Sequence, residues 1–576
     1  MCSTQHQPVK NPLYKSWKGF YKVFVRVFFS RNKSHGKRPP KFMNNHTITL
    51  DCNSNQACGL GQYAIDMLTG RYPGPSRTVL AKTEQFHLDS IACGISALAC
   101  GCNAPNVLRE EALHYAVEDR STGVPMFGTQ VLVHPEKAIL ACASAVREWD
   151  ANGTNFGYNP LRAATAGEFG HNDYYPVAIA AAQLAGLDGG KTLLAMTLLD
   201  EIRGRLAEVF ALKNHKIDHV LHGAIASAVV YGAVLGATVD QIESAIGLVV
   251  AHHVPFRAIR AGHQLSDSKG ASAAISAEVA VASMRRAMRG FAGPGDVFRN
   301  PQALFCLFEP PETANTSPFD LTLTTTGDDF AVMGMHFKLG LYEHQSAGAI
   351  QGLLDLLAEK PHLVDDLSQL QGVQIMIYEP AFSIIGDPDK HNPQTRQSAD
   401  HSMVYIIATL IRKAHEARLE GWDGSNGWRK LMLTPDDYTE NETALNHPVT
   451  RTLMQRIDFQ HGGPDYDDKY PDGIPTQIQI NHTVHGVCSS GLVMYPEGHA
   501  RCQSDIFHEL LQEKFMALAT LGVDDPPHYG SDSQISPKSR LKTSPHSTTL
   551  KSVFRDLNNQ SCDCHSPCCH VAVRNF

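Results

Sequence analysis

The sequence predicts a mainly α-helical protein, with a large all-helical domain and an inserted, smaller α+β domain. From about residue 57 to residue 290, apolar residues recur at three- and four-residue spacings, as they do on amphipathic helices. Before about residue 330, no segment alternates as a strand does. Beyond residue 330, short alternating segments appear between helices, which is typical of an α+β domain.

The helical part divides into short segments separated by Gly, Pro and polar residues. Helices are expected from about Ala57 and over 87–99, 106–122, 136–148, 177–185, 191–212, 221–235, 239–252 and 270–290. Gly236 stands where a C-terminal cap belongs, and Thr238 with Gln241 forms a capping box for the helix that follows. The many Ala, Gly and Ser residues let neighbouring helices pack closely.

The pattern changes after residue 330. A helix is expected over 347–359, and alternating residues predict strands around 373–377 and 477–480, with a helix over 399–418 between them. A last helix, 506–521, could rejoin the helical domain. The predicted parts are an N-terminal extension (1–48), a helical domain (55–332), an α+β lid (335–505), the returning helix (506–522) and a disordered tail (526–576).

Both ends of the chain differ from its middle. Residues 1–48 are basic, aromatic and free of Asp and Glu, which fits a mitochondrial presequence or a start site placed upstream of Met43. The expected location is therefore mitochondrial or cytoplasmic. The tail contains zinc-type residues between Cys562 and His570, but no partner cluster accompanies them, which favours an unstructured tail over a metal site.

Composition narrows the function. Residues 51–576 carry 40 Lys and Arg against 58 Asp and Glu, and so strong an acidic excess argues against nucleic acid as the main partner. No apolar run reaches the roughly 18 residues that a membrane helix needs. The 14 cysteines do not form the regular framework of a secreted disulfide protein, so an intracellular protein with reduced thiols is expected.

The stretch from Trp149 to Pro176 is the most unusual part of the chain. It reads as a Gly-punctuated loop that joins two helices and contains many polar side chains. A polar surface connection would explain the composition. However, His171 stands among carboxylates directly before the next helix, and this arrangement suits general acid–base catalysis.

Several separated motifs then occur in one order along residues 55–522. They are Trp149-Asp150-x-Asn152-x-Thr154 with the following Gly-His171, then Asp218-His219, Lys269-Gly270-Ala271, Lys338, Asp400-His401-Ser402-x-x-Tyr405 and Tyr495-Pro496-x-Gly498-His499. In this order the motifs resemble the MmgE/PrpD family, which includes 2-methylcitrate dehydratase and cis-aconitate decarboxylase. The residues of two segments, Glu168–Asp173 and Lys338–Ser346, are most similar to those of fungal members. The resemblance implies a homodimer whose active site lies between the helical domain and the lid, and catalysis without metal or organic cofactor.

The resemblance also implies the site residues. The implied catalytic set is Asp150, Thr154, His171, His219, Lys338 and Tyr405, and Lys269 and His401 would bind the substrate. One position departs from the family. The relatives place a second lysine where this chain has Leu265, so the carboxylate clamp is expected to be shifted to Lys269 or built differently.

These residue types suit dehydration of an alcohol that stands beside carboxylates. Lys338 would stabilise the carboxylate whose α-carbon loses a proton, and His171 and His219 are candidates for the base and the acid. Asp150 could orient a histidine or take the proton, while Thr154 and Tyr405 could bind the hydroxyl or a carboxylate.

The expected activity is dehydration of 2-methylcitrate, as in propionate breakdown, or of a longer 2-alkylcitrate, as in a secondary-metabolite pathway. Decarboxylation of cis-aconitate to itaconate and epimerisation by the same proton abstraction stay open. A non-catalytic helical interaction protein is the remaining alternative, and it is disfavoured because the catalytic residue types are all present.

Overall fold

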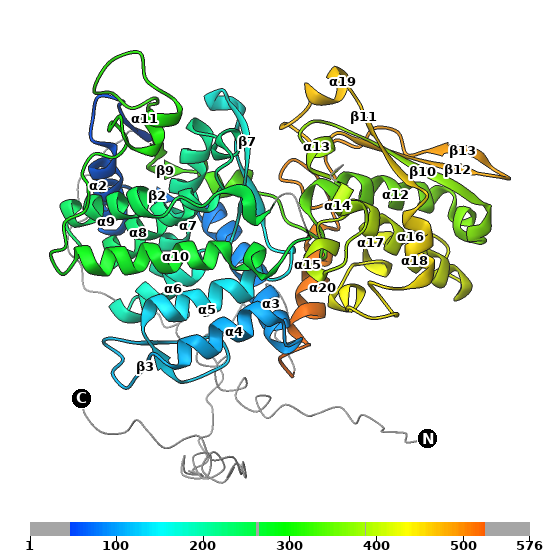
Figure 1. The fold of residues 1–576 in the computed structure, drawn as a ribbon, viewed down its shortest axis with the longest axis horizontal. Helices are drawn as coiled ribbons and strands as arrows, with labels where there is room; N and C mark the ends of the chain where they lie inside the picture. The colour runs from blue at the N-terminus through cyan, green and yellow to red at the C-terminus, as the bar shows by residue number, and fades with distance from the viewer. Residues whose placement is uncertain (1–45, 261–263, 386–387, 525–576) are drawn as a thin grey trace, which may run out of the picture. The chain divides into compact units, whose positions relative to one another are not determined.

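The computed structural model describes residues 46–260, 264–385 and 388–524, and all of them fall within one compact unit of the chain (Figure 1). The mainly helical fold expected from the sequence is confirmed. Most of the predicted N-terminal extension, and the tail with its Cys and His residues, lie outside the described residues. The division into a helical domain and an inserted lid stays a prediction.

Most helices of the first part match the predicted ones to within a few residues, but α3 begins ten residues earlier than expected, at Arg77 in place of His87. They are α2 (Gln56–Leu68), α3 (Arg77–Ala99), α4 (Asn103–Leu113), α5 (Pro135–Arg147), α6 (Tyr175–Ala185), α7 (Gly189–Val209), α8 (Val220–Val234), α9 (Val239–His252), α10 (Asp267–Ala287) and the short α11 (Leu304–Phe308). Figure 1 shows α5 and α10 running alongside each other, and α10 also packs against α8. The capping box of Thr238 and Gln241 is present at the start of α9.

The expectation that no strand precedes residue 330 is wrong. Short strands occur at β1 (Thr47–Leu50), β2 (Gly74–Pro75), β3 (Ala116–Val117), β4 (Val124–Pro125), β5 (Leu132–Val133), β6 (Thr154–Asn159), β7 (Ala164–His171), β8 (Leu321–Thr324) and β9 (Thr326–Gly327). The helix expected over 106–122 ends at Leu113, and β3 follows it. Strand β1 pairs with β8, so the last residues of the predicted extension, Thr47 and Ile48, take part in the fold. Most of these strands have two to four residues, too few to give a recognisable alternation.

The stretch predicted to be a loop is a β-hairpin. Strands β6 and β7 pair antiparallel, with Thr154 opposite His171, and a 3-10 turn at Pro160–Arg162 joins them. The sequence hid this hairpin because its strands are rich in Gly, Asn and Thr and lack alternating apolar residues. Two register shifts interrupt the pairing between Thr154 and Tyr158.

The later part of the chain forms the α+β arrangement that the sequence predicts. A four-stranded sheet has the order β11-β10-β12-β13, from β10 (Leu370–Ile377), β11 (Ile457–His461), β12 (Thr476–His482) and β13 (Gly486–Ser489). Strand β10 pairs parallel with β11 and antiparallel with β12. Helix α12 (Ala347–Glu359) packs on β12, and α16 (Met403–Leu419) contacts β11 (Figure 1). Shorter helices are α13 (Ala381–Ile385), α14 (Pro388–His391), α15 (Arg396–Ala399), α17 (Gly427–Lys430), α18 (Pro448–Met454) and α19 (Pro464–Asp467).

The last described helix, α20 (Phe507–Ala519), packs against α3 near the start of the chain. Its buried Lys514 donates hydrogen bonds to Asp89 Oδ1 at 2.6 Å and to the carbonyl oxygen of Ala151 at 2.5 Å. The C-terminal helix therefore holds the backbone directly beside Asp150.

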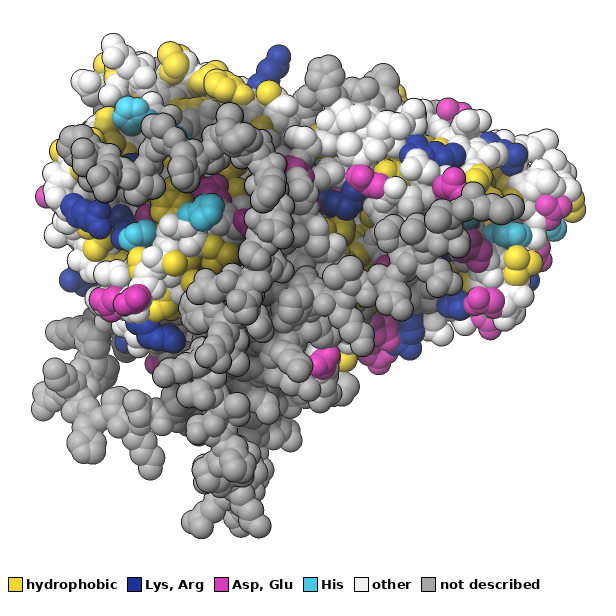
Figure 2. Space-filling view, turned by 60° about the horizontal axis from the view of Figure 1, so that its bottom comes forward, with side chains coloured by type: hydrophobic (Ala, Val, Ile, Leu, Met, Phe, Trp, Pro, Cys, Tyr) yellow, Lys and Arg dark blue, Asp and Glu magenta, His cyan; other side chains and the backbone are white. Residues whose placement is uncertain are grey.

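Among the described helices, none is by itself both long and apolar enough to cross a membrane. Helices α3 and α4 reach that length and composition only as a pair, and they are bent by 87°. On the face drawn in Figure 2, the side chains that are not grey include Lys, Arg, Asp, Glu and His in a mixed arrangement. Neither sign of charge dominates that part of the surface.

Candidate active site

One cavity brings together most of the residues that the sequence predicts to be functional. Its wall is formed by Arg147, Asp150, Thr154, His171, His219, Arg257, Arg260, Lys338, Glu343, His344, Gln345, Lys390 and His401. Six of the eight predicted residues are in this wall. The other two, Lys269 and Tyr405, are not.

The hairpin positions two of these side chains. Thr154 opens β6 and His171 closes β7, so their pairing brings both to the same end of the hairpin. Thr154 also exchanges two backbone hydrogen bonds of 2.9 Å with His336, close to Lys338. The buried Thr154 hydroxyl has no hydrogen-bond partner among the described residues and is left for a ligand.

Asp150 lies at the centre of an ionic network. Its Oδ1 contacts Lys338 Nζ and lies 3.2 Å from Arg147, while its Oδ2 lies 2.7 Å from His401 Nε2. Burial acts to raise the pKa of Asp150, but Arg147, Lys338 and His401 outweigh it and hold the pKa well below its usual range. Asp150 is therefore ionised and cannot easily serve as the base. It fixes Lys338 and His401 in place.

His401 bridges two carboxylates, because its Nδ1 also lies 2.7 Å from Asp400 Oδ1. Burial and the charge of Lys269 lower the pKa of His401, and the two carboxylates oppose that shift. Both ring nitrogens can donate only when the ring is protonated. His401 thus has a stronger structural reason to hold a proton than the other histidines of the cavity.

Lys269 lies behind this network instead of in the cavity wall. Its ammonium lies 3.1 Å from Asp400 Oδ1 and 3.9 Å from Asp150 Oδ2, and the side chain is fully buried in α10. Leu265 is buried as well, and its N–H donates to Ser398 Oγ at 2.7 Å. The segment that replaces the expected second lysine therefore connects two parts of the fold and brings no charge to the cavity at either position.

Tyr405 points elsewhere. It lies on α16, and its buried hydroxyl donates to the backbone carbonyl of Asp437. Burial raises the pKa of Tyr405 to about 12, so the phenol stays protonated. In this arrangement Tyr405 holds α16 against the segment at Asp437 and does not line the cavity.

The two central histidines differ in their hydrogen bonds. Arg147 donates to His171 Nε2 at 3.2 Å, and burial with the charge of Arg147 lowers the pKa of His171 well below its usual value. Because a guanidinium can only donate, Nε2 accepts and the neutral ring carries its proton on Nδ1. His171 is thus arranged as a hydrogen-bond donor, and its Nδ1 has no partner in the described part of the chain.

His219 is arranged as an acceptor. It is the N-cap residue of α8, and its Nε2 faces Asp218 Oδ1 at 3.7 Å. An N–H on that side, directed at the carboxylate, leaves the lone pair on Nδ1, which likewise has no partner among the described residues. Burial lowers the pKa of His219 well below its usual value, although Asp218 opposes the shift. A neutral histidine with a free acceptor nitrogen has the form of a general base.

The turn Glu343–Gln345 follows Lys338 closely in the chain, but the sequence analysis assigned it no role. Burial raises the pKa of Glu343 to about 7, so this carboxyl is partly protonated near neutral pH. The two ring nitrogens of His344 and the side-chain amide of Gln345 are buried without hydrogen-bond partners among the described residues. Unpaired buried polar atoms on a cavity wall indicate a ligand that would satisfy them.

A metal ion could in principle use Asp150, Asp400 and His401, whose ligand atoms lie within 4.8 Å of one another. The same carboxylates already contact Lys338 and Lys269. Two ammonium groups on the donor oxygens repel a cation, so the residues present fit a metal poorly. That catalysis needs no cofactor stays a prediction.

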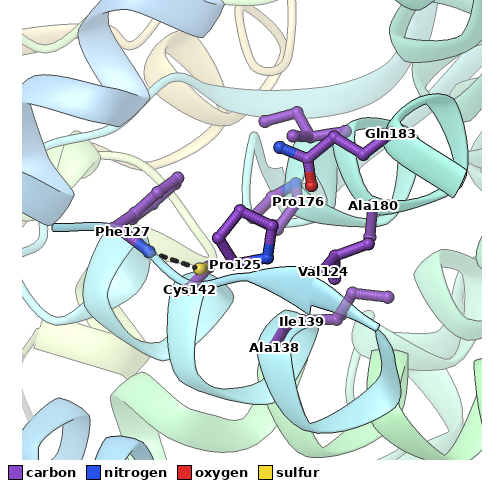
Figure 3. Close-up of a pocket in the computed structure, with 10 residues that line it drawn as sticks. Val124, Pro125, Phe127, Ala138, Ile139, Cys142, Pro176, Ala180 and Gln183 are labelled. Carbon is purple, nitrogen blue, oxygen red and sulfur yellow. Dashed lines mark hydrogen bonds between the residues drawn. The ribbon is translucent and has the colours of Figure 1, made fainter. Parts of the chain in front are cut away.

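A second cavity, drawn in Figure 3, has a different character. Val124, Phe127, Ile139, Ala180 and other mostly apolar residues line it, and the one dashed contact joins the Phe127 N–H to Cys142 Sγ at 3.3 Å. A wall without acids or bases cannot perform proton transfer. This space is a gap in helix packing.

Sequence reasoning missed several cavity residues. They are Arg147, Arg257, Arg260, Glu343, His344, Gln345 and Lys390. Arg147 lies two residues before Trp149, and Glu343, His344 and Gln345 follow Lys338 within seven residues, so proximity to a motif was the available signal. Arg257 and Arg260 lie outside the motifs, so the sequence analysis had no reason to select them.

Comparison with known proteins agrees with the order of motifs. A family model described as the MmgE/PrpD N-terminal domain matches residues 63–316. The chain is 25% identical over 459 residues to 2-methylcitrate dehydratases of Salmonella typhi and Salmonella typhimurium, covering 75% of this chain and 84% of each relative. It is 24% identical over 451 residues to 2-methylcitrate dehydratase of Escherichia coli K12, with the same coverage. Residues 63–316 therefore match the N-terminal domain of the MmgE/PrpD family, and the similarity to 2-methylcitrate dehydratases over a longer stretch supports the same family.

Proposed function

We propose that the protein is a hydro-lyase that dehydrates 2-methylcitrate, or a longer 2-alkylcitrate, to the corresponding alkyl-cis-aconitate by acid–base catalysis without a metal. The observation that carries this proposal is the cavity itself. It combines a neutral base (His219), a lysine held by a carboxylate (Lys338) and a carboxyl that is partly protonated near neutral pH (Glu343). The names of the relatives supply the substrate class.

The charges around the cavity suit a polyanion. Five cationic side chains line it, and only two carboxyl groups do. The cationic residues are Arg147, Arg257, Arg260, Lys338 and Lys390. One of the carboxyl groups, Glu343, is also partly neutral at pH 7. An excess of positive charge in a buried site favours a substrate with several carboxylates.

The proposed reaction begins with proton removal. His219 Nδ1 takes the proton from the carbon next to a carboxylate, and Lys338 stabilises the negative charge that develops on that carboxylate. The double bond forms as the hydroxyl leaves from the neighbouring carbon. Glu343 gives its proton to the departing hydroxide, which leaves as water. No electrons are exchanged with another molecule, so the reaction requires no redox partner.

The first test is direct turnover. Purified protein is incubated with citrate, 2-methylcitrate, an octylcitrate and cis-aconitate, and products are followed by mass spectrometry. We expect loss of 18 mass units from 2-methylcitrate or the longer alkylcitrate, unchanged after prolonged treatment with EDTA. Release of carbon dioxide from cis-aconitate, without dehydration of either alkylcitrate, would contradict the proposal. Loss of activity in EDTA, restored by added metal, would contradict the metal-free mechanism.

The pH dependence gives a second prediction. Because burial raises the pKa of Glu343 to about 7, its proton is present below that pH and is lost above it. The base, His219, has a lowered pKa and therefore stays neutral in the same range. We expect kcat to be level between about pH 5.5 and 6.5 and to fall tenfold for each pH unit well above 7.

The Glu343→Gln variant supplies the control for this profile. It keeps the size of the side chain and cannot release a proton. Its kcat should be low and should no longer decline above pH 7. If kcat of the parent rises steadily up to pH 8.5, Glu343 is not the acid.

A further inference from the structure

Arg257 and Arg260 enter the cavity from a short 3-10 turn that precedes the start of α10. The turn covers Arg257–Ile259, and Arg260 follows it directly. Both side chains are half-buried and line the same cavity as Asp150 and Lys338. Neither arginine belongs to any of the motifs that identify the family.

The backbone fixes this turn beside the proposed base. The N–H of Asp218 donates to the carbonyl oxygen of Pro255 at 2.8 Å, and the N–H of Arg257 donates to that of Lys216 at 3.0 Å. An antiparallel bridge between Ile217 and Phe256 lies between these bonds. The arginine turn is thus held to the segment that ends at His219. Groups built on a fixed backbone can recognise a ligand without first being ordered.

The two arginines are in different states. The guanidinium of Arg260 lies against Asp218, with Nε 2.6 Å from Oδ2 and NH2 3.5 Å from Oδ1. Asp218 is fully buried, and Arg260 outweighs its burial to hold its pKa below the usual range. Arg257 also lowers the pKa of Asp218, but less than Arg260 does, and its side chain forms no ion pair or hydrogen bond with the described residues. Its charge is available to a ligand, whereas that of Arg260 is largely compensated.

Lys338 reaches the cavity from a different segment and is bound to Asp150. An extended substrate with several carboxylates could therefore meet cations from two separate segments of the chain. A guanidinium presents two parallel N–H donors that match the two oxygens of a carboxylate.

We infer that Arg257 binds the substrate carboxylate farthest from the carbon that loses its proton, and that it makes the site selective for tricarboxylates over dicarboxylates. This inference rests on the proposed dehydratase function. Arg260 is the positioning residue, because its pair with Asp218 holds the turn and screens that carboxylate from the arriving anion.

Substrate truncation tests this role. In 2,3-dimethylmalate the remote carboxymethyl arm of 2-methylcitrate is replaced by a methyl group, and the reacting carbons are unchanged. For Arg257→Gln we expect kcat/KM on 2-methylcitrate to fall by about 10²-fold and kcat/KM on 2,3-dimethylmalate to change less than about threefold. Arg257→Lys should recover part of the loss, since it restores the charge without the fork.

A matched control removes an arginine elsewhere. Arg289 is exposed just beyond the C-terminal end of α10, while Lys269 and the cavity lie near its N-terminal end. Arg289→Gln should behave as the parent on both substrates. An equal loss on the tricarboxylate and the dicarboxylate for Arg257→Gln would overturn the inference, because the residue would then serve the reacting end or the fold.

Binding measured without turnover separates this inference from the proposed reaction. Calorimetry with propane-1,2,3-tricarboxylate, which has no hydroxyl to lose, should show about 10²-fold weaker binding to Arg257→Gln than to the parent, with succinate affinity unchanged. The parent protein could fail to dehydrate any substrate while this difference in binding is still found. The proposed reaction would then be wrong, and the role of Arg257 in binding a carboxylate would be retained. Equal affinity of parent and variant for the tricarboxylate would show that Arg257 does not bind a carboxylate of the substrate.

Discussion

Replacing His219 with alanine is expected to lower kcat for 2-methylcitrate by about 10²–10⁴-fold, with a small change in KM. The variant removes the ring whose Nδ1 is free to accept a proton, while the cations that bind the substrate stay in place. Steady-state turnover is the measurement, after thermal unfolding has shown that the variant melts like the parent. His219→Asn keeps a polar side chain at the start of α8 and separates a loss of chemistry from a loss of packing.

Two other histidine variants provide the comparison for the kcat of His219→Ala. His114→Ala removes an exposed histidine after α4 and should leave kcat at the parental value. His171→Ala removes a ring whose Nε2 already accepts from Arg147, so it should lower kcat less than His219→Ala does. If His171→Ala is the more damaging of the two, the base is on the hairpin, and our assignment of the two rings is reversed.

Replacing Lys338 with methionine should lower kcat/KM by about 10²–10³-fold and affect both kcat and KM. Methionine keeps the apolar length of the side chain but removes the charge that meets the substrate before and during the reaction. Asp150 keeps Arg147 and His401 as partners, so the variant is expected to fold. The comparison is made at saturating and at low substrate concentration.

The charge alone should not restore the parental rate. Lys338→Arg is expected to recover more of the binding than of kcat, because a planar fork cannot occupy the place of a compact ammonium against Asp150. Lys191→Met, at an exposed position in α7, is the matched control. A parental kcat in Lys338→Met would show that another group stabilises the developing carboxylate.

The helices could be predicted because their signals are local. Periodic apolar residues fixed most helices of the first part to within a few residues, and the capping box of Thr238 marked the start of α9. The sheet strands β10 and β12 were found for the same reason, since their alternation faces one buried side. The hairpin β6–β7 was missed because tertiary contacts, including the bridge from Thr154 to His336, hold strands with little alternation of their own.

The site was predictable only as far as its motifs extended. The ordered motifs led to Asp150, Thr154, His171, His219, Lys338 and His401, which the structure gathers in one cavity. Roles were harder to infer, because they depend on which partner each group meets. Lys269 pairs with Asp400, which lies 131 residues further along the chain, and the Tyr405 hydroxyl donates a hydrogen bond to a backbone carbonyl. No spacing within the sequence reports such pairings.

The ionic network also has a consequence for biosynthesis. Asp150 is made early, yet Lys338 and His401 follow it by 188 and 251 positions, and Lys514 of α20, which holds the carbonyl of Ala151, comes later still. A chain still attached to the ribosome can fold its first helices while Asp150 lacks its lysine and its histidine. Contacts between such distant residues form late, because long loops must close before they can be made. We therefore expect the nascent helical part to become compact before it can catalyse the reaction. The active-site residues should reach their final arrangement only when α20 docks.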